Sequence, residues 1–225
     1  MTGPALVAVA HGSTDPAAAD AVSALAQEVR RLAPVLDIRT AFVQHAEHTF
    51  GQQLAETGPG AIVVPLLLST GYHLTSDIAP AAVAAGARVA PPLGPDDLLT
   101  VALVARLREA GVPQGTPAVL AAAGSTDPFA EHAVADQAKL LAAETRAPVI
   151  TAFAAAGRPT VPQAVAALRA ATMGPVAIAS YLLAPGQFHD RLQHAGANWV
   201  SQPLAAHPAV AALVIDRYRA ARLAA

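Results

Sequence analysis

The chain has 225 residues, of which 54% are hydrophobic and 13% are charged, so it can fold as one large domain or two small ones and is not disordered. A formal net charge of −2 and an aromatic content of 4% argue against a nucleic-acid partner, because phosphates attract clustered Lys and Arg and single strands stack on aromatic rings. The absence of cysteine excludes disulfides, iron–sulfur clusters and thiolate metal sites, which leaves His, carboxylate, amide or water as metal ligands.

Four apolar runs in the first half are predicted to be strands, at residues 5–10, 38–43, 61–68 and 88–90. The runs are continuously apolar, as expected for strands that helices cover on both faces. Helical patterns lie between them, and strands that alternate with helices indicate a parallel sheet.

The helix after the first strand has the clearest helical pattern. Its apolar residues recur on one face, at Val22, Leu25, Val29 and Leu32. Thr14 or Asp15 can cap this helix, with Pro16 at its first position.

The second half of the chain repeats the first. The pentapeptide Gly-Ser-Thr-Asp-Pro at residues 12–16 recurs at 124–128, an offset of 112, and further ordered matches follow at offsets of 111 to 115. Strands are predicted at the corresponding runs, residues 118–123, 149–154, 176–183 and 198–201. Ordered matches at a nearly constant offset indicate an internal duplication. We therefore expect an α/β protein of two similar lobes, each a mostly parallel sheet flanked by helices.

The two lobes are expected at residues 1–112 and 117–225, joined by a linker rich in Gly and Pro at 111–117. In such folds ligands bind at the carboxyl ends of the strands. Two lobes of this kind would face each other across a cleft.

Two histidines follow neighbouring strands at the carboxyl edge of the first sheet. His11 comes directly after the first predicted strand, and His73 follows the third. Either one alone would be interpreted as a loop histidine, but together they could reach one site. Imidazole suits iron, cobalt, nickel and zinc, so the pair predicts a metal site.

The loop after the second strand supplies further polar groups. Gln44 offers a carbonyl oxygen, and Glu47 is a candidate base or ligand, although a helix-capping role before Thr49 fits it equally well. His45 and His48 in the same loop are expected to be exposed to solvent.

The second half lacks this set of residues. Ala123 corresponds to His11, Ala155 to Gln44 and Arg158 to Glu47. The turn therefore folds without the histidine, which favours a functional role for His11 over a structural one. We expect one asymmetric metal site, in the first lobe.

The second lobe would contribute walls to the site and contacts for anions. Phe188 corresponds to His73, and His189 is one residue away. Arg158, His189 and Arg191 are the candidate anion contacts, and each can equally be interpreted as an ordinary surface charge.

These motifs resemble the sirohydrochlorin chelatases, which are class II, ATP-independent tetrapyrrole chelatases, in their long and internally duplicated form. The matching segments cover nearly the whole chain and are residues 7–13, Ala41-Phe42 with Glu47, residues 63–73, Asp77-Ile78 and residues 92–94. The segment at 63–73, which ends in Gly-Tyr-His, is the most specific of them.

The resemblance implies a chelatase-like fold and a metal held by His11 and His73. It also implies insertion of Fe²⁺ or Co²⁺ into sirohydrochlorin, to give siroheme or the cobalt precursor of cobalamin. The metal is then a substrate, with Ni²⁺ an alternative that imidazole also accepts, and neither ATP nor an organic cofactor is expected. Many members carry a carboxylate where this chain has Gln44, so the pyrrole protons would pass to Glu47 or to a histidine.

The substrate carries many carboxylates, and helix N-termini favour anions. We therefore expect one or both of the repeated loops to hold substrate carboxylates, through backbone N–H groups and the hydroxyl of Ser13 or Ser125. Gln44 and His189 are expected as further substrate contacts. The opposing interpretation is that Asp15 and Asp127 already cap these helices and repel an anion.

No apolar stretch approaches the roughly 20 residues that span a bilayer, and the apolar N-terminus lacks the basic lead of a signal peptide. We expect a cytoplasmic monomer that binds neither membrane nor nucleic acid. Two other functions fit the same residues. A metal or tetrapyrrole carrier would use the same cleft without turnover, and a phosphohydrolase would use the His-Gly-Ser turn, but no Arg flanks His11.

Overall fold

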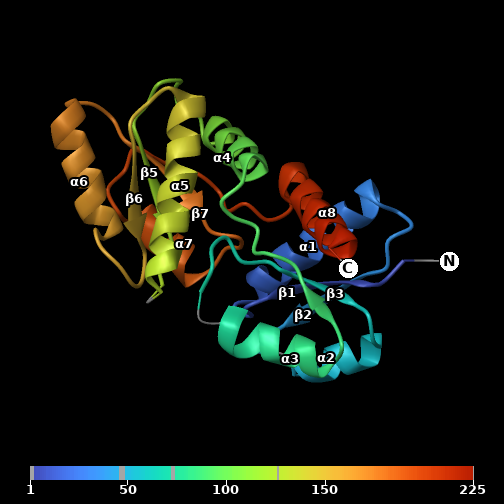
Figure 1. The fold of residues 1–225 in the computed structure, drawn as a ribbon. Coiled ribbons are helices and arrows are strands. Elements are labelled where there is room, and N and C mark those ends of the chain that lie inside the picture. The colour runs from blue at the N-terminus through green and yellow to red at the C-terminus, as the bar shows by residue number, and fades with distance from the viewer. Residues whose placement is uncertain (1–2, 46–48, 72–73, 126, 225) are drawn as a thin grey trace. The chain divides into compact units, whose positions relative to one another are not determined.

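The computed structural model describes residues 3–45, 49–71, 74–125 and 127–224. The order of strands and helices in the first half recurs in the second half (Figure 1). The predicted duplication of an α/β unit is therefore confirmed.

The first sheet has four parallel strands in the order β2-β1-β3-β4. They are β1 (Leu6–Ala10), β2 (Ile38–Phe42), β3 (Ile62–Pro65) and β4 (Arg88–Val89). Each strand lies inside its predicted run, and β3 ends earlier than predicted, at Pro65. The central strands β1 and β3 are buried along their whole length, as their apolar sequences indicate.

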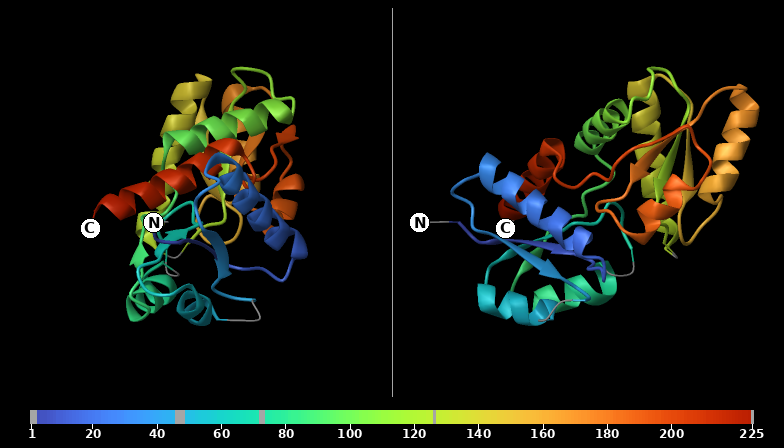
Figure 2. Two further views of the ribbon diagram at one scale, coloured as in Figure 1. Left: turned by 90° about the vertical axis from the view of Figure 1, so that its right-hand side faces the viewer. Right: turned by 180° about the vertical axis from the view of Figure 1, so that it is seen from behind.

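Helices cover both faces of this sheet. The helix α2 (Phe50–Thr57), the π-helical turn η1 (Leu74–Ile78) and the helix α3 (Ala79–Ala84) form one core with one face. Helices α1 (Pro16–Leu32) and α8 (Pro208–Leu223) pack against each other, and they contact β2 and β3 respectively. Figure 2 shows α8 beside α1 in both views.

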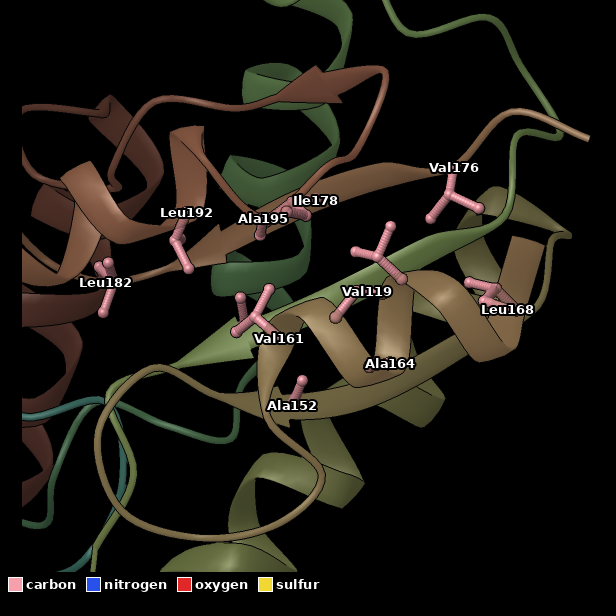
Figure 3. Close-up of a cluster of buried hydrophobic side chains, with 12 residues drawn as sticks. Val119, Ala152, Val161, Ala164, Leu168, Val176, Ile178, Leu182, Leu192 and Ala195 are labelled. Carbon is pink, nitrogen blue, oxygen red and sulfur yellow. The ribbon is translucent and has the colours of Figure 1, made fainter. Parts of the chain in front are cut away.

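The second sheet repeats this plan, with parallel strands in the order β6-β5-β7-β8. They are β5 (Ala118–Ala122), β6 (Val149–Phe153), β7 (Ala177–Tyr181) and β8 (Trp199–Val200). Helices α6 (Val161–Thr172) and α7 (Gln187–Gln193) cover one face, where their side chains enclose a core with β5 and β7 (Figure 3). Helices α4 (Asp97–Glu109) and α5 (Pro128–Thr145) pack together and contact β7 and β6 respectively.

The last helix of each half packs in the other unit. Unit 1 comprises residues 1–93 and 205–225, and unit 2 comprises residues 94–204. Consequently α8 belongs to the first sheet and α4 to the second. The expected lobes, 1–112 and 117–225, describe the sequence repeat and differ from these packing units, because the segment 111–117 joins α4 to β5 inside unit 2.

Specific hydrogen bonds hold each exchanged helix. In unit 1, Arg217 of α8 donates to the carbonyl oxygens of Pro92 (2.9 Å) and Leu93 (2.8 Å). In unit 2, the fully buried amide of Gln137 in α5 donates to Thr100 Oγ1 (2.8 Å) and accepts from the backbone N–H of Asp96 (2.9 Å). Each helix is therefore fixed by polar contacts as well as by apolar packing. Within the part of the chain that the structure describes, no helix is both long and apolar enough to cross a membrane.

Candidate functional site

The first strand and the second strand stay paired beyond their ends. Val43 N donates to Ala10 O (3.0 Å), and Gln44 N then donates to His11 O (2.9 Å). His11 is exposed and follows the last residue of β1. The structure therefore places His11 beside Gln44 at the carboxyl edge of the first sheet.

Gly12 makes this close approach possible. Its φ is +96°, a left-handed conformation that side chains rarely adopt. A β-carbon at Gly12 would lie 1.9 Å from the carbonyl oxygen of Gln44. The same relation recurs in the second half, where a β-carbon at Gly124 would lie 1.8 Å from Ala156 O. The close backbone contact thus requires the glycine of the repeated pentapeptide.

The third strand reaches the same edge. Leu66 N donates to Val9 O (2.8 Å), so the chain that leaves β3 begins beside β1. After Gly71, whose carbonyl oxygen accepts from Leu74 N (3.0 Å), the chain enters the π-helical turn η1. Turns of this kind are rare and occur often at functional sites.

Two of the expected site residues, His73 and Glu47, lie outside the described residues. The flanking residues are described, and they bring the ends of β1, β2 and β3 to one edge. Among the described residues alone, no three His, Asp or Glu side chains gather closely enough to hold a metal ion. The roles of His11, His73 and Glu47 therefore remain predictions.

Thr70 is a polar residue at this edge that the sequence did not single out. Its Oγ1 is buried and has no hydrogen-bond partner among the residues that the structure describes. A buried hydroxyl without a partner costs free energy, on the order of 1–3 kcal/mol. The polar pair Ser69-Thr70 directly after the apolar run is the sequence signal that could have identified it.

The two repeated loops are occupied by their own capping bonds. Asp15 caps α1 by accepting from Ala17 N (2.9 Å), and Asp127 caps α5 by accepting from Phe129 N (2.9 Å). Ser13 Oγ accepts from Asp15 N (3.0 Å), and the corresponding serine of the second loop makes the same bond. These bonds match the interpretation in which the aspartates cap the helices.

The N-terminus of α2 is capped by Thr49 and Gln52. Thr49 Oγ1 accepts from Gln52 N (3.3 Å), and the Gln52 side chain accepts from Thr49 N (2.7 Å). This reciprocal pair satisfies the first turn of the helix. Glu47 itself lies outside the described residues, so both roles considered for it stay predictions.

His189 is buried in unit 2, where its Nε2 lies 3.2 Å from the carbonyl oxygen of Ser201. Its neighbour Phe188, which corresponds to His73, is 38% exposed. One residue along α7 thus separates an exposed side chain from a buried one. The substrate contact expected of His189 stays a prediction.

Tyr181 ends β7, at the carboxyl edge of the second sheet, and is almost fully buried. Burial, and secondarily the carboxylate of Asp96, raises the pKa of its phenol well above the ordinary value of 10.0. The phenol therefore stays protonated at neutral pH. Its burial at this position is a feature that the sequence analysis did not identify.

Comparisons with known proteins agree on one family. The CbiX family model matches residues 5–110 and again 117–221. SirB from Bacillus subtilis with Fe³⁺ superposes with a TM-score of 0.79 at 25% identity, covering 96% of this chain and 94% of that one. The cobalt complex of the sirohydrochlorin chelatase SirB from Bacillus subtilis subspecies spizizenii gives 0.77 at 22% identity, with coverage of 96% and 94%.

A third structure is CbiX, described as the terminal enzyme of siroheme biosynthesis in denitrifying bacteria. Its TM-score is 0.72 at 24% identity, and the match covers 96% of this chain and 99% of that one. No curated protein sequence matches the chain significantly.

Proposed function

Since this chain belongs to the CbiX family, whose model matches both of its halves, we propose that it is a sirohydrochlorin chelatase that inserts Fe²⁺ or Co²⁺ into the tetrapyrrole. The observation that carries this proposal is the match to SirB, at 25% identity over 96% of the chain. The solved SirB structures contain Fe³⁺ in one case and cobalt in the other. The metal is the substrate of the reaction, and the enzyme is a metal chelatase.

We propose that His11 and His73 present the metal. The position of His11 at the carboxyl edge, where ligands of parallel α/β sheets bind, supports this role. Neutral imidazoles bind these metals without adding charge, so the ion can still pass to the four ring nitrogens. Because a protonated imidazole cannot bind a metal ion, metal loading should weaken as the pH falls.

Insertion also requires that two pyrrole protons leave the ring. Gln44, which the backbone holds beside His11, can offer its carbonyl oxygen to the metal but cannot accept a proton. Glu47, in the same loop, carries a carboxylate that can do so. We therefore propose Glu47 as the proton acceptor, with a histidine as the alternative.

The alternative function is a metal or tetrapyrrole carrier, and turnover separates the two. The purified protein should metallate sirohydrochlorin over many cycles with Fe²⁺ or Co²⁺, followed by absorbance, at the same rate with and without ATP. One equivalent of metallated product per protein would indicate a carrier. A strict ATP requirement would contradict the proposed reaction. The monomeric state and the cytoplasmic location expected from the sequence stay predictions.

A further inference from the structure

Two arginines lie at the carboxyl edge of the second sheet, in unit 2. Arg191 of α7 donates from Nη1 to the carbonyl oxygen of Ala154, the first residue after β6 (3.3 Å). Arg158 lies in the same loop, which folds back so that Phe153 N donates to Pro159 O (3.1 Å). Both side chains are exposed.

The core beneath them shows that α7 and the start of α6 share this end of the sheet. Val161, at the start of α6, and Leu192, next to Arg191, belong to one buried cluster. Figure 3 shows Val161 over β5 and Leu192 on α7, beside β7. The two arginines are therefore carried by neighbouring parts of a rigid framework.

The hydrogen-bond partners of both guanidinium groups are neutral. Arg158 Nη1 lies 3.5 Å from Gln163 Oε1, and Arg191 Nη2 lies 3.3 Å from Gln187 Oε1. Among the described residues, these and the Ala154 carbonyl are neutral partners, and neither arginine forms an ion pair. Arg191 uses two of its five N–H donors in this way, so its fork can still bind a carboxylate.

The ring of Phe188 adds an apolar surface beside these charges. The guanidinium of Arg191 lies 5.7 Å from the centre of this ring, and the side chain of Phe188 is 38% exposed. A cation held over an aromatic ring is restrained in direction. An apolar ring next to the cation of Arg191 is complementary to the rim of a tetrapyrrole, where carboxylate side chains are attached to an apolar macrocycle.

Comparison of the two halves supports a functional role for the positive charge of Arg158. Arg158 corresponds to Glu47 of the first half. The half that carries His11 thus has a carboxylate at this position, which suits a metal cation, and the other half has a guanidinium, which suits an anion.

From these observations we propose that Arg158 and Arg191 bind peripheral carboxylates of the tetrapyrrole, an inference that rests on the proposed function. Phe188 supports the guanidinium of Arg191 and contacts the edge of the ring. The arginines act on substrate affinity and have no part in holding the metal.

The test uses the full chain with Arg158→Gln, Arg191→Gln and the double substitution. Arg146→Gln is the matched control, because Arg146 is exposed and ends α5 shortly before β6 begins, at the opposite edge of the sheet. Binding of metal-free sirohydrochlorin is measured by fluorescence titration, and the KM values for tetrapyrrole and for metal are measured in steady state.

Each single substitution should raise the Kd and the KM for the tetrapyrrole by about twofold to fivefold, as expected for an exposed charge pair. The double substitution should raise both by about tenfold and flatten the dependence of the Kd on salt. The KM for the metal should not change, and Arg158→Lys and Arg191→Lys should recover part of the affinity.

The inference would be overturned if the unmodified enzyme is active and the double variant binds sirohydrochlorin with the same Kd and the same salt dependence. The proposed function would then remain intact. A wild-type protein that neither binds nor metallates sirohydrochlorin would overturn both. If Arg191→Gln impairs folding, Arg158→Gln and Arg191→Lys still decide the outcome.

Discussion

Gly12 and Gln44 approach so closely that a β-carbon at Gly12 would lie 1.9 Å from the carbonyl oxygen of Gln44. This contact and the bond from Gln44 N to His11 O (2.9 Å) join the ends of β1 and β2. The position of His11 therefore depends on the absence of a side chain at the next residue, Gly12.

Gly12→Ala should destabilise the protein by at least about 2 kcal/mol, because it adds a clash with backbone to the cost of a left-handed residue. Urea unfolding provides the measurement. Gly115→Ala is the matched control, since Gly115 also has a positive φ (+79°) but its β-carbon would meet nothing within 4 Å. Equal losses of stability in the two variants would contradict the steric explanation.

Gln137→Leu should lower the free energy of unfolding by about 1–3 kcal/mol, because it leaves buried polar groups of Asp96 and Thr100 with fewer partners. Leu25 occupies the corresponding position in the first half, so leucine is compatible with this type of helix. Gln27→Leu, at an exposed position of α1, should change stability by less than about 0.5 kcal/mol. A Gln137→Leu variant as stable as the wild type would show that the buried amide does not hold α4.

The raised pKa of Tyr181 makes unfolding sensitive to alkali. The folded state keeps the proton of the phenol while the unfolded chain releases it above pH 10.0, so this contribution to stability is complete below that pH and is lost as the pH rises further. The unfolding free energy of the wild type should therefore fall more steeply above pH 10.0 than that of Tyr181→Phe, by up to about 1.4 kcal/mol per pH unit. Chemical unfolding of both proteins over this range is the measurement, and parallel curves would contradict it.

The duplicated fold could be predicted because its determinants are local. The pentapeptide at residues 12–16 and 124–128 starts a helix in both halves, with Asp15 and Asp127 as the caps. The apolar runs before them are buried strands, as their composition indicates. Strand order and parallel pairing then follow from the alternation of strands and helices.

The exchange of α4 and α8 could not be predicted, because both helices are apolar enough to cover either of two similar sheets. The choice depends on bonds between distant residues, such as Gln137 to Thr100, 37 positions apart, and Arg217 to Leu93, 124 positions apart. No local pattern encodes these partners.

The candidate site was predictable only in part. The pairing of His11 with Gln44 follows because β1 and β2 are parallel and end at the same edge of the sheet. The burial of His189 does not follow from the sequence, because a difference of one residue in α7 decides whether a side chain enters the core or meets solvent. The unpaired hydroxyl of Thr70 depends on the path of a loop, which periodicity does not determine.

The central claim is that this chain metallates sirohydrochlorin with His11 and His73 as the residues that present the metal. The most direct test is the multiple-turnover rate of metal insertion by the wild type, His11→Ala, His73→Ala and the exposed control His194→Ala. We predict that His11→Ala and His73→Ala each slow insertion by more than about 100-fold. This exceeds the usual effect of removing a residue that hydrogen-bonds to a metal ligand. The control should keep the wild-type rate. Insertion at the wild-type rate by either of the first two variants would contradict the account.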